Sequence, residues 1–200
     1  MRDSESNYWD KEANGRLSGN GSISDNIWKR QYLVANLLNA GMIDQRILEI
    51  GIGTATAIGA IQLAILGKFK YIGTDVSKKF VEHGKKWDLD VRHTDILNLP
   101  DINGGFTRVI CLDTLEHVKP EDRQAGYQEI NRVLAKHSKI LLNVPVEETR
   151  HNLEFDHHFD IIDILQLAQT CNMSLKKYNP YVADLPKDIK MRYIWVELER

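Results

Sequence analysis

Short apolar runs alternate with amphipathic segments along most of this 200-residue chain, and this alternation restricts the fold more than any other feature. Runs rich in Ile, Leu and Val have the length of buried strands, and most are followed by apolar residues at helical spacing. The strands predicted in this way are 46–50, 69–73, 89–93, 107–112 and 139–144. Two more predicted strands, 174–182 and 191–198, follow one another without a helix between them.

Parallel strands need long crossover connections, usually helices, whereas strands joined by a short loop pair in antiparallel fashion. The alternation therefore predicts an α/β fold. We expect a doubly wound, mostly parallel seven-stranded sheet that ends in an antiparallel hairpin.

The first two dozen residues differ in composition from the rest. Asn14–Ser22 is rich in Gly, Ser and Asn, which predicts an irregular segment, although Tyr8 and Trp9 could dock on the remainder or close over a ligand. We therefore expect a flexible N-terminal leader or lid over residues 1–23 and a single domain over 24–200.

The overall charge and the cysteine content exclude several classes of protein. A net charge of -2 gives no global basic field, so a nucleic-acid partner is not favoured. The two cysteines are too few for a disulfide scaffold or a cysteine-based zinc site. The sequence shows no apolar signal segment and no membrane-spanning run, which predicts a cytoplasmic protein without a membrane partner. Nothing in it specifies an oligomeric state.

A glycine-rich turn lies between the predicted strand 46–50 and the helix after it. Gly51 and Gly53 form a Gly-x-Gly sequence at the place where open α/β sheets bind ligands. Glycine lets the backbone pass close to a ligand, and the helix N-terminus offers free N–H donors. Thr56 replaces the third glycine of the dinucleotide-binding fingerprint.

Acidic residues stand at or near the ends of four successive predicted strands: Glu49, Asp75, Asp95 and Asp113. Because the carboxyl ends of parallel strands share one sheet edge, they predict a strongly negative crevice. Asp75 follows Gly51 by 24 residues (75 minus 51), near the spacing of a carboxylate that binds ribose hydroxyls. Such a crevice suits a ligand with ammonium and sulfonium charges and suits a pyrophosphate poorly.

These motifs, in this order, resemble those of class I S-adenosylmethionine-dependent methyltransferases over residues 24–200. Glu49–Thr54 is similar to the family's glycine-rich first motif, with Ala55 in place of the usual final glycine. The resemblance implies a cofactor site that holds S-adenosylmethionine. Its residues would be Glu49, Gly51, Gly53, Thr54, Asp75 (ribose hydroxyls), Val76 (beside adenine), Asp95 (adenine amino group), Ile96 (over the ring) and Asp113.

Histidines near two strand ends are the candidate general bases. His117 follows the fourth predicted strand and His157 the fifth, and histidine titrates near neutral pH. Asp113, Glu116 and His117 have the spacing i, i+3, i+4. They resemble the Glu, Glu and His of ubiquinone-biosynthesis O-methyltransferases, which are proposed to hold a metal. A structural role is favoured here, and we expect no metal.

The prediction for function is methyl transfer from S-adenosylmethionine to an oxygen or nitrogen of a small molecule. Three alternatives stay open on the sequence. The acceptor could be a nucleic acid or a protein, the chain could be a nicotinamide-dependent oxidoreductase, or it could bind the cofactor without catalysing a reaction.

Overall fold

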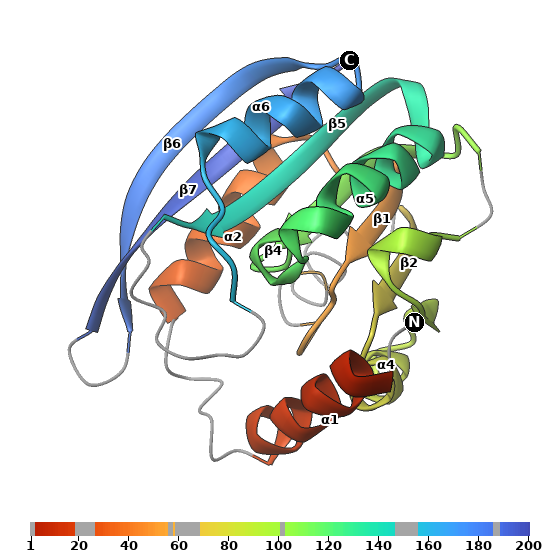
Figure 1. Ribbon diagram of the computed structural model, residues 1–200, viewed down its shortest axis with the longest axis vertical. Coiled ribbons are helices and arrows are strands. Elements are labelled where there is room, and N and C mark those ends of the chain that lie inside the picture. Colours follow the sequence, from red (N-terminus) through yellow and green to blue (C-terminus); the bar gives the residue numbers. More distant parts are fainter. Residues whose placement is uncertain are drawn as a thin grey trace.

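A computed structural model of the chain describes residues 3–18, 27–55, 58, 69–100, 103–146, 156–185 and 189–200. Within this part, a seven-stranded sheet forms the centre of the molecule (Figure 1). Its strands are β1 (Arg46–Ile50), β2 (Lys70–Asp75), β3 (Val91–His93), β4 (Phe106–Leu112), β5 (Leu134–Pro145), β6 (Ser174–Leu185) and β7 (Ile189–Glu199). They pair in the order β3-β2-β1-β4-β5-β7-β6.

The strand directions confirm the predicted fold. β1 pairs in parallel with both β2 and β4, β2 with β3, and β4 with β5. β7 is antiparallel to β5 and to β6, so the last two strands form the expected hairpin. The carboxyl ends of β1 to β4 therefore meet at one edge of the sheet.

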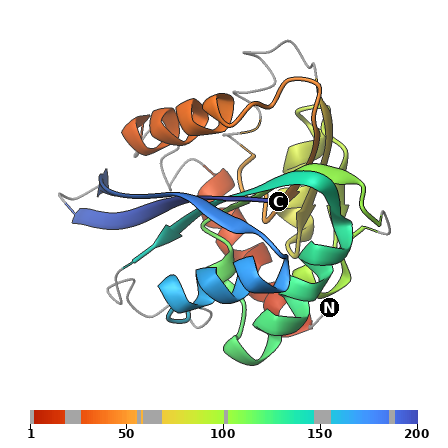
Figure 2. The same ribbon diagram turned by 90° about the horizontal axis from the view of Figure 1, so that it is seen from above.

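Helices cover both faces of the sheet. They are α1 (Asp3–Leu17), α2 (Ile27–Asn39), α4 (Lys78–Lys85), α5 (Pro120–Val133) and α6 (Ile161–Thr170), with 3-10 turns η2 (Ile96–Asn98) and η3 (Leu115–His117). Seen from above, α2 lies on one side of the sheet, and α5 and α6 lie on the other (Figure 2). The helix predicted after the glycine turn falls largely outside the described residues.

The core consists of two apolar layers, because alternate residues of the central strands point to opposite faces. Leu48 and Val109 pack on the side of Ile130 and α5. Ile47 and Ile110 pack on the side of Leu37 and α2. Burial on both faces explains why these strands are apolar throughout.

Apolar spacing in the sequence predicts two inward helical faces that the structure corrects, one made of Phe80, Val81, Gly84 and Trp87, the other of Ile161, Ile164, Leu165 and Ala168. Trp87 is 42% exposed because α4 ends at Lys85, before the tryptophan. On α6, Ile161 and Leu165 were predicted to face inward, but Leu165 is 52% exposed. The buried stripe there is centred on Ile164 and continues through Leu167 and Ala168, which leaves Ile161 and Leu165 on its flank.

The N-terminal segment differs from the expectation of an irregular leader. Residues Asp3–Leu17 form α1, because Trp9 and Ala13 are buried against the rest of the molecule and tertiary packing outweighs weak helix propensity. A lid function for residues 1–23 stays a prediction. In the part of the chain described above, no helix has both the length and the apolar character needed to cross a bilayer.

Candidate active site

The glycine turn begins where β1 ends. The backbone N–H groups of Gly51 and Ile52 both donate to the carbonyl oxygen of Thr74, at 2.8 and 3.1 Å, so the chain bends toward β2. Gly51 has φ +75° and Gly53 has φ +49°. A Cβ on Gly51 would overlap the side chain of Thr114, whereas one on Gly53 would meet no heavy atom within 4 Å. Packing therefore requires Gly51, and Gly53 presents its backbone to open space.

Ala55 also adopts the left-handed conformation, with φ +54°, and it is fully buried. Its N–H donates to the carbonyl oxygen of Ile52 at 2.8 Å. This conformation costs an L-residue with a Cβ roughly 1–2 kcal/mol. The backbone here thus has the geometry that the family's usual glycine accommodates without strain. Thr56 lies outside the described residues.

Asp75 ends β2 and is fixed from two sides. Its Oδ2 accepts from the N–H of Gly53 at 3.0 Å, and its Oδ1 accepts from the N–H of Ser77 at 2.8 Å. Burial raises the pKa of this carboxyl group to about 6, although both hydrogen bonds oppose the shift. The glycine turn and the start of α4 therefore hold a carboxylate at the edge of the sheet where the carboxyl ends of β1 to β4 meet. We call this edge the ligand edge.

Glu49 lies on β1 and is 3% exposed. Its Oε2 accepts a 2.6 Å hydrogen bond from the hydroxyl of Tyr71. Burial, followed by the charge of Asp75, raises the pKa of Glu49 to about 7. A cation bound beside the two carboxylates would lower both pKa values, so this part of the sheet edge favours a positively charged ligand.

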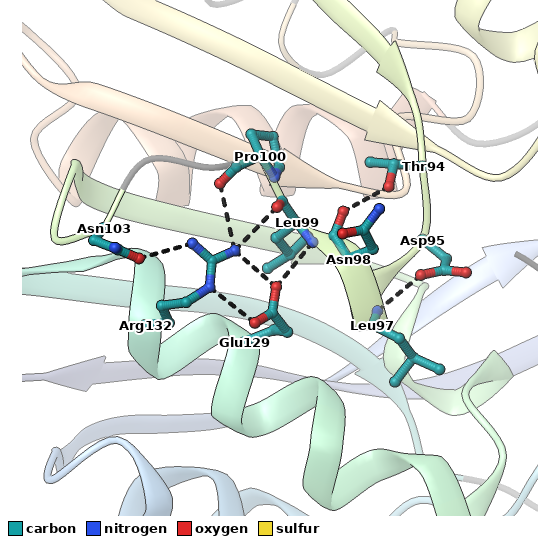
Figure 3. Close-up of polar contacts among 9 residues, drawn as sticks. All are labelled: Thr94, Asp95, Leu97, Asn98, Leu99, Pro100, Asn103, Glu129 and Arg132. Carbon is teal, nitrogen blue, oxygen red and sulfur yellow. Dashed lines mark hydrogen bonds and ion pairs between the residues drawn. The ribbon is translucent and has the colours of Figure 1, made fainter.

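Asp95 and Ile96 lie in the connection after β3. The Asp95 side chain caps η2 by accepting from the N–H of Leu97 at 3.0 Å (Figure 3). Ile96 is buried and packs closely on Gly126 of α5, where a Cβ would come within 3.1 Å of its side chain. The small residue at Gly126 thus allows this segment to approach α5.

An ion pair on α5 holds the following residues of the connection. Arg132 donates to both carboxylate oxygens of Glu129, at 2.8 and 2.7 Å, in a bidentate pair. Glu129 also accepts from the N–H of Leu99, and Arg132 donates to the carbonyl oxygen of Leu99 and to the side chain of Asn103 (Figure 3). We call Glu129 and Arg132 the α5 clamp.

Asp113 directly follows β4 and has φ +53°. Its N–H donates to the carbonyl oxygen of Asn143 at 2.8 Å, and its Oδ1 accepts from the Asn143 amide at 2.6 Å. Asn143 is fully buried, and its own Oδ1 accepts from the hydroxyl of Tyr181 at 2.5 Å. Asp113 is thereby tied to β5 and β6.

The two candidate bases lie in neighbouring segments. The N–H of His157 donates to the carbonyl oxygen of Glu116 at 2.9 Å, which joins η3 to the segment before α6. His117 Nδ1 lies 2.8 Å from Asp156 Oδ1. Burial lowers the pKa of His157. The Trp9 ring of α1 lies 4.6 Å from the His117 ring, centroid to centroid.

Asp113, Glu116 and His117 do not converge on one point. The Asp113 carboxylate bonds to Asn143, whereas the nearest oxygen of Glu116 lies 4.0 Å from His117 Nε2. Among the described residues, no group of three His, Cys, Asp or Glu side chains is placed to hold a metal ion.

The remaining predicted residues lie beside this edge as well. Thr54 is half-buried in the glycine turn, and Val76 is half-buried just after β2. The carbonyl oxygen of Val76 lies 2.9 Å from His93 Nε2. Asn143 and Asp156 contact predicted residues from distant parts of the chain and carry no local sequence signal.

Comparisons with known proteins agree with this arrangement. Magnesium protoporphyrin IX methyltransferase from Synechocystis PCC 6803, crystallised with SAH, aligns with a TM-score of 0.73 at 16% identity, covering 98% of this chain and 97% of that one. Burkholderia thailandensis 1,6-didemethyltoxoflavin-N1-methyltransferase, with its namesake compound and S-adenosylhomocysteine bound, has a TM-score of 0.68 at 16% identity, covering 96% and 86%. The cyclase SpnF has a TM-score of 0.71 at 12% identity, covering 96% and 93%.

These structures establish the fold. The sequence matches no curated protein. It does match the family described as "Methyltransferase domain" over residues 47–137, a region that runs from β1 through α5 and contains the glycine turn, Asp75, Asp95 and Asp113. Residues 47–137 are therefore similar to a methyltransferase domain, and the chain has the fold of S-adenosylmethionine-dependent methyltransferases.

Proposed function

We propose that this enzyme transfers the methyl group of S-adenosylmethionine to an oxygen or nitrogen atom of a small molecule. The observation that carries the proposal is the position of Asp75, whose carboxylate is held between the N–H groups of Gly53 and Ser77 at the ligand edge. A fixed carboxylate beside an open glycine turn suits a nucleoside with free ribose hydroxyls. The proposed cofactor residues are Glu49, Gly51, Gly53, Thr54, Asp75, Val76, Asp95, Ile96 and Asp113.

Each part of the site has a distinct task in this proposal. Asp75 accepts hydrogen bonds from the ribose, and Gly53 lets the ligand approach the backbone. Asp95 accepts from the adenine amino group, and Ile96 covers the ring. The crevice that contains Glu49 attracts the positive charge of the cofactor.

Methyl transfer from a sulfonium is an in-line displacement in which positive charge disperses. Alignment of the acceptor with the methyl group supplies most of the acceleration. A general base is required only if the acceptor must lose a proton. We propose His117 or His157 for that role. Asp156, 2.8 Å from His117 Nδ1, would stabilise a protonated His117. The lowered pKa of His157 keeps its ring neutral near pH 7.

A small-molecule acceptor agrees with the acidic net charge of -2, which gives no general attraction for nucleic acid. It also agrees with the Burkholderia enzyme of the same fold, whose crystal contains 1,6-didemethyltoxoflavin. The atom that receives the methyl group is part of the proposal.

Calorimetric titration of the full chain with S-adenosylhomocysteine tests the cofactor site. We expect saturable binding that Asp75→Ala weakens at least tenfold, because a buried charged acceptor is lost. Asp90→Ala, which removes an exposed carboxylate near β3, is the matched control and should bind as the wild type does. Binding of NAD in place of S-adenosylhomocysteine, or an unchanged affinity in Asp75→Ala, would refute the assignment.

Turnover needs its own test, because the cyclase SpnF shares this fold. Wild-type enzyme is incubated with S-adenosylmethionine and panels of small phenols, carboxylic acids and amines, and S-adenosylhomocysteine is measured. Transfer RNA and peptide pools are run in parallel. Methylation confined to the macromolecular pools would contradict a small-molecule acceptor. A histidine that acts as the base should, when changed to Gln, lower kcat more than the affinity for S-adenosylhomocysteine.

A further inference from the structure

α1 lies beside α4 at the ligand edge of the sheet (Figure 1). Four of the residues through which α1 contacts the rest of the molecule have the spacing i, i+3, i+4, i+7 of one helical face. They are Ser6, Trp9, Asp10 and Ala13. Apart from Asp10, which is half-buried, all of them are buried.

Asp10 is the polar centre of this face. Its Oδ1 accepts from the Ser77 hydroxyl at 2.7 Å and from the N–H of Lys79 at 3.2 Å. Ser77 is fully buried and caps α4, and its own N–H donates to Asp75. Only one residue therefore separates Asp10 from the carboxylate proposed to bind the ribose.

Two other residues of the same face reach other parts of the proposed site. The Ser6 hydroxyl lies 3.5 Å from His93 Nε2, and that nitrogen lies 2.9 Å from the carbonyl oxygen of Val76. The Trp9 ring packs against His117. Through these contacts α1 connects the ends of β2 and β3 with η3.

The composition of this face limits how strongly α1 is held. Of the apolar side chains of α1, only Trp9 and Ala13 are buried, whereas Tyr8 and Leu17 are half-buried. Segments with few buried apolar contacts open at low free-energy cost. If docking of α1 strengthens cofactor binding by some factor, thermodynamic linkage requires that the bound cofactor favour docking of α1 by the same factor.

We propose that Asp10 is a positioning residue of the cofactor site. By holding Ser77, it couples the docking of α1 to the binding of S-adenosylmethionine at Asp75. This inference rests on the proposed function, because it assumes that Asp75 contacts the cofactor.

The test compares Asp10→Ala and Asp10→Asn in the full chain by calorimetric titration with S-adenosylhomocysteine. Asp10→Ala removes the acceptor for two hydrogen bonds and should raise the Kd about tenfold. Asn keeps an acceptor oxygen, so Asp10→Asn should recover most of the affinity. Asn7→Ala is the matched control, because Asn7 lies on the same helix with an exposed side chain. Its Kd should equal that of the wild type.

Amide hydrogen exchange separates coupling from a purely structural role. In the wild type, S-adenosylhomocysteine should slow exchange throughout residues 3–17, and in Asp10→Ala this protection should be largely lost. If Asp10→Ala fails to fold, Asp10→Asn and Ser77→Ala carry the test, and Ser77→Ala should reproduce the loss of protection.

The two proposals fail in different ways. Wild-type protein that does not bind S-adenosylhomocysteine would overturn the proposed function. Wild-type protein that binds it, with equal affinity in Asp10→Ala or without protection of α1, would overturn only the role of Asp10.

Discussion

Gly51→Ala should mainly lower the stability of the protein, whereas Gly53→Ala should mainly weaken ligand binding. In Gly51→Ala, the left-handed conformation costs roughly 1–2 kcal/mol. Overlap of the new Cβ with Thr114 adds about 1–3 kcal/mol. The lower entropy of the unfolded alanine chain offsets about 0.5–1 kcal/mol. The net expectation is a loss of about 1–4.5 kcal/mol in the free energy of unfolding.

Gly53→Ala meets no neighbouring atom, and its φ of +49° lies close to the left-handed minimum. Its free energy of unfolding should therefore fall by only about 0–1.5 kcal/mol. The new methyl group, however, projects into the open space where the ligand should approach. We expect S-adenosylhomocysteine affinity to fall at least tenfold.

Urea unfolding followed by circular dichroism measures the first quantity, and calorimetric titration measures the second. In a chain of this size, each kcal/mol corresponds to roughly 2–4 °C in Tm, so a thermal scan gives an independent check. Thr114→Ala in the Gly51→Ala background should recover part of the stability, because it removes the two overlapping side-chain atoms. Equal stability losses in both glycine variants, or wild-type binding by Gly53→Ala, would refute this reasoning.

Three further predictions follow from the buried and strained groups of the site. The pKa of Glu49 is raised to about 7 from its usual 4.5, so the folded state favours the neutral form of this carboxyl group. The contribution of Glu49 to the free energy of unfolding is therefore fully present below pH 4.5 and is lost as the pH rises through 7. Glu49→Gln should therefore be more stable than the wild type by about 3 kcal/mol at pH 8 but not at pH 4.5. Urea unfolding at several pH values measures this difference. Parallel pH profiles of the two proteins would contradict the raised pKa of Glu49. Ala55→Gly should relieve the left-handed strain and raise the free energy of unfolding by about 0–1 kcal/mol in thermal or urea unfolding, whereas a clear loss would show that the methyl group is needed for packing. Arg132→Ala, which breaks the α5 clamp, should weaken S-adenosylhomocysteine binding about threefold to tenfold. Its effect should be non-additive with Asp95→Ala in a double-mutant cycle, and strict additivity would show that the clamp does not act on the adenine-side segment.

The local motifs of the site could be predicted because their signals lie within short stretches of sequence. The turn at Gly51 is an example, since a strand, two glycines and a helix follow one another directly. Asp75 was likewise placed by its distance along the chain from that turn. Its hydrogen bonds to Gly53 and Ser77 then agree with the predicted location, although its contact with ribose stays a prediction.

Partners of the candidate residues were beyond prediction, because each comes from a remote segment. Asn143 bonds to Asp113 across a separation of 30 residues, and the contact between Ser77 and Asp10 spans 67. Neither pair has a characteristic spacing that one sequence could reveal. The α5 clamp is a mixed case, because Glu129 and Arg132 are helical neighbours, but their hold on Leu99 is a tertiary contact.

By itself, the sequence determined the order of strands and helices, the terminal hairpin and the acidic edge of the sheet, because periodicity and strand ends are local properties. The tertiary structure alone decided that residues 3–17 form a helix docked beside α4, that Asp113 bonds to Asn143, and that Asp156 lies beside His117. Those outcomes depend on packing between distant segments, and here packing outweighed a local composition that favours an irregular chain.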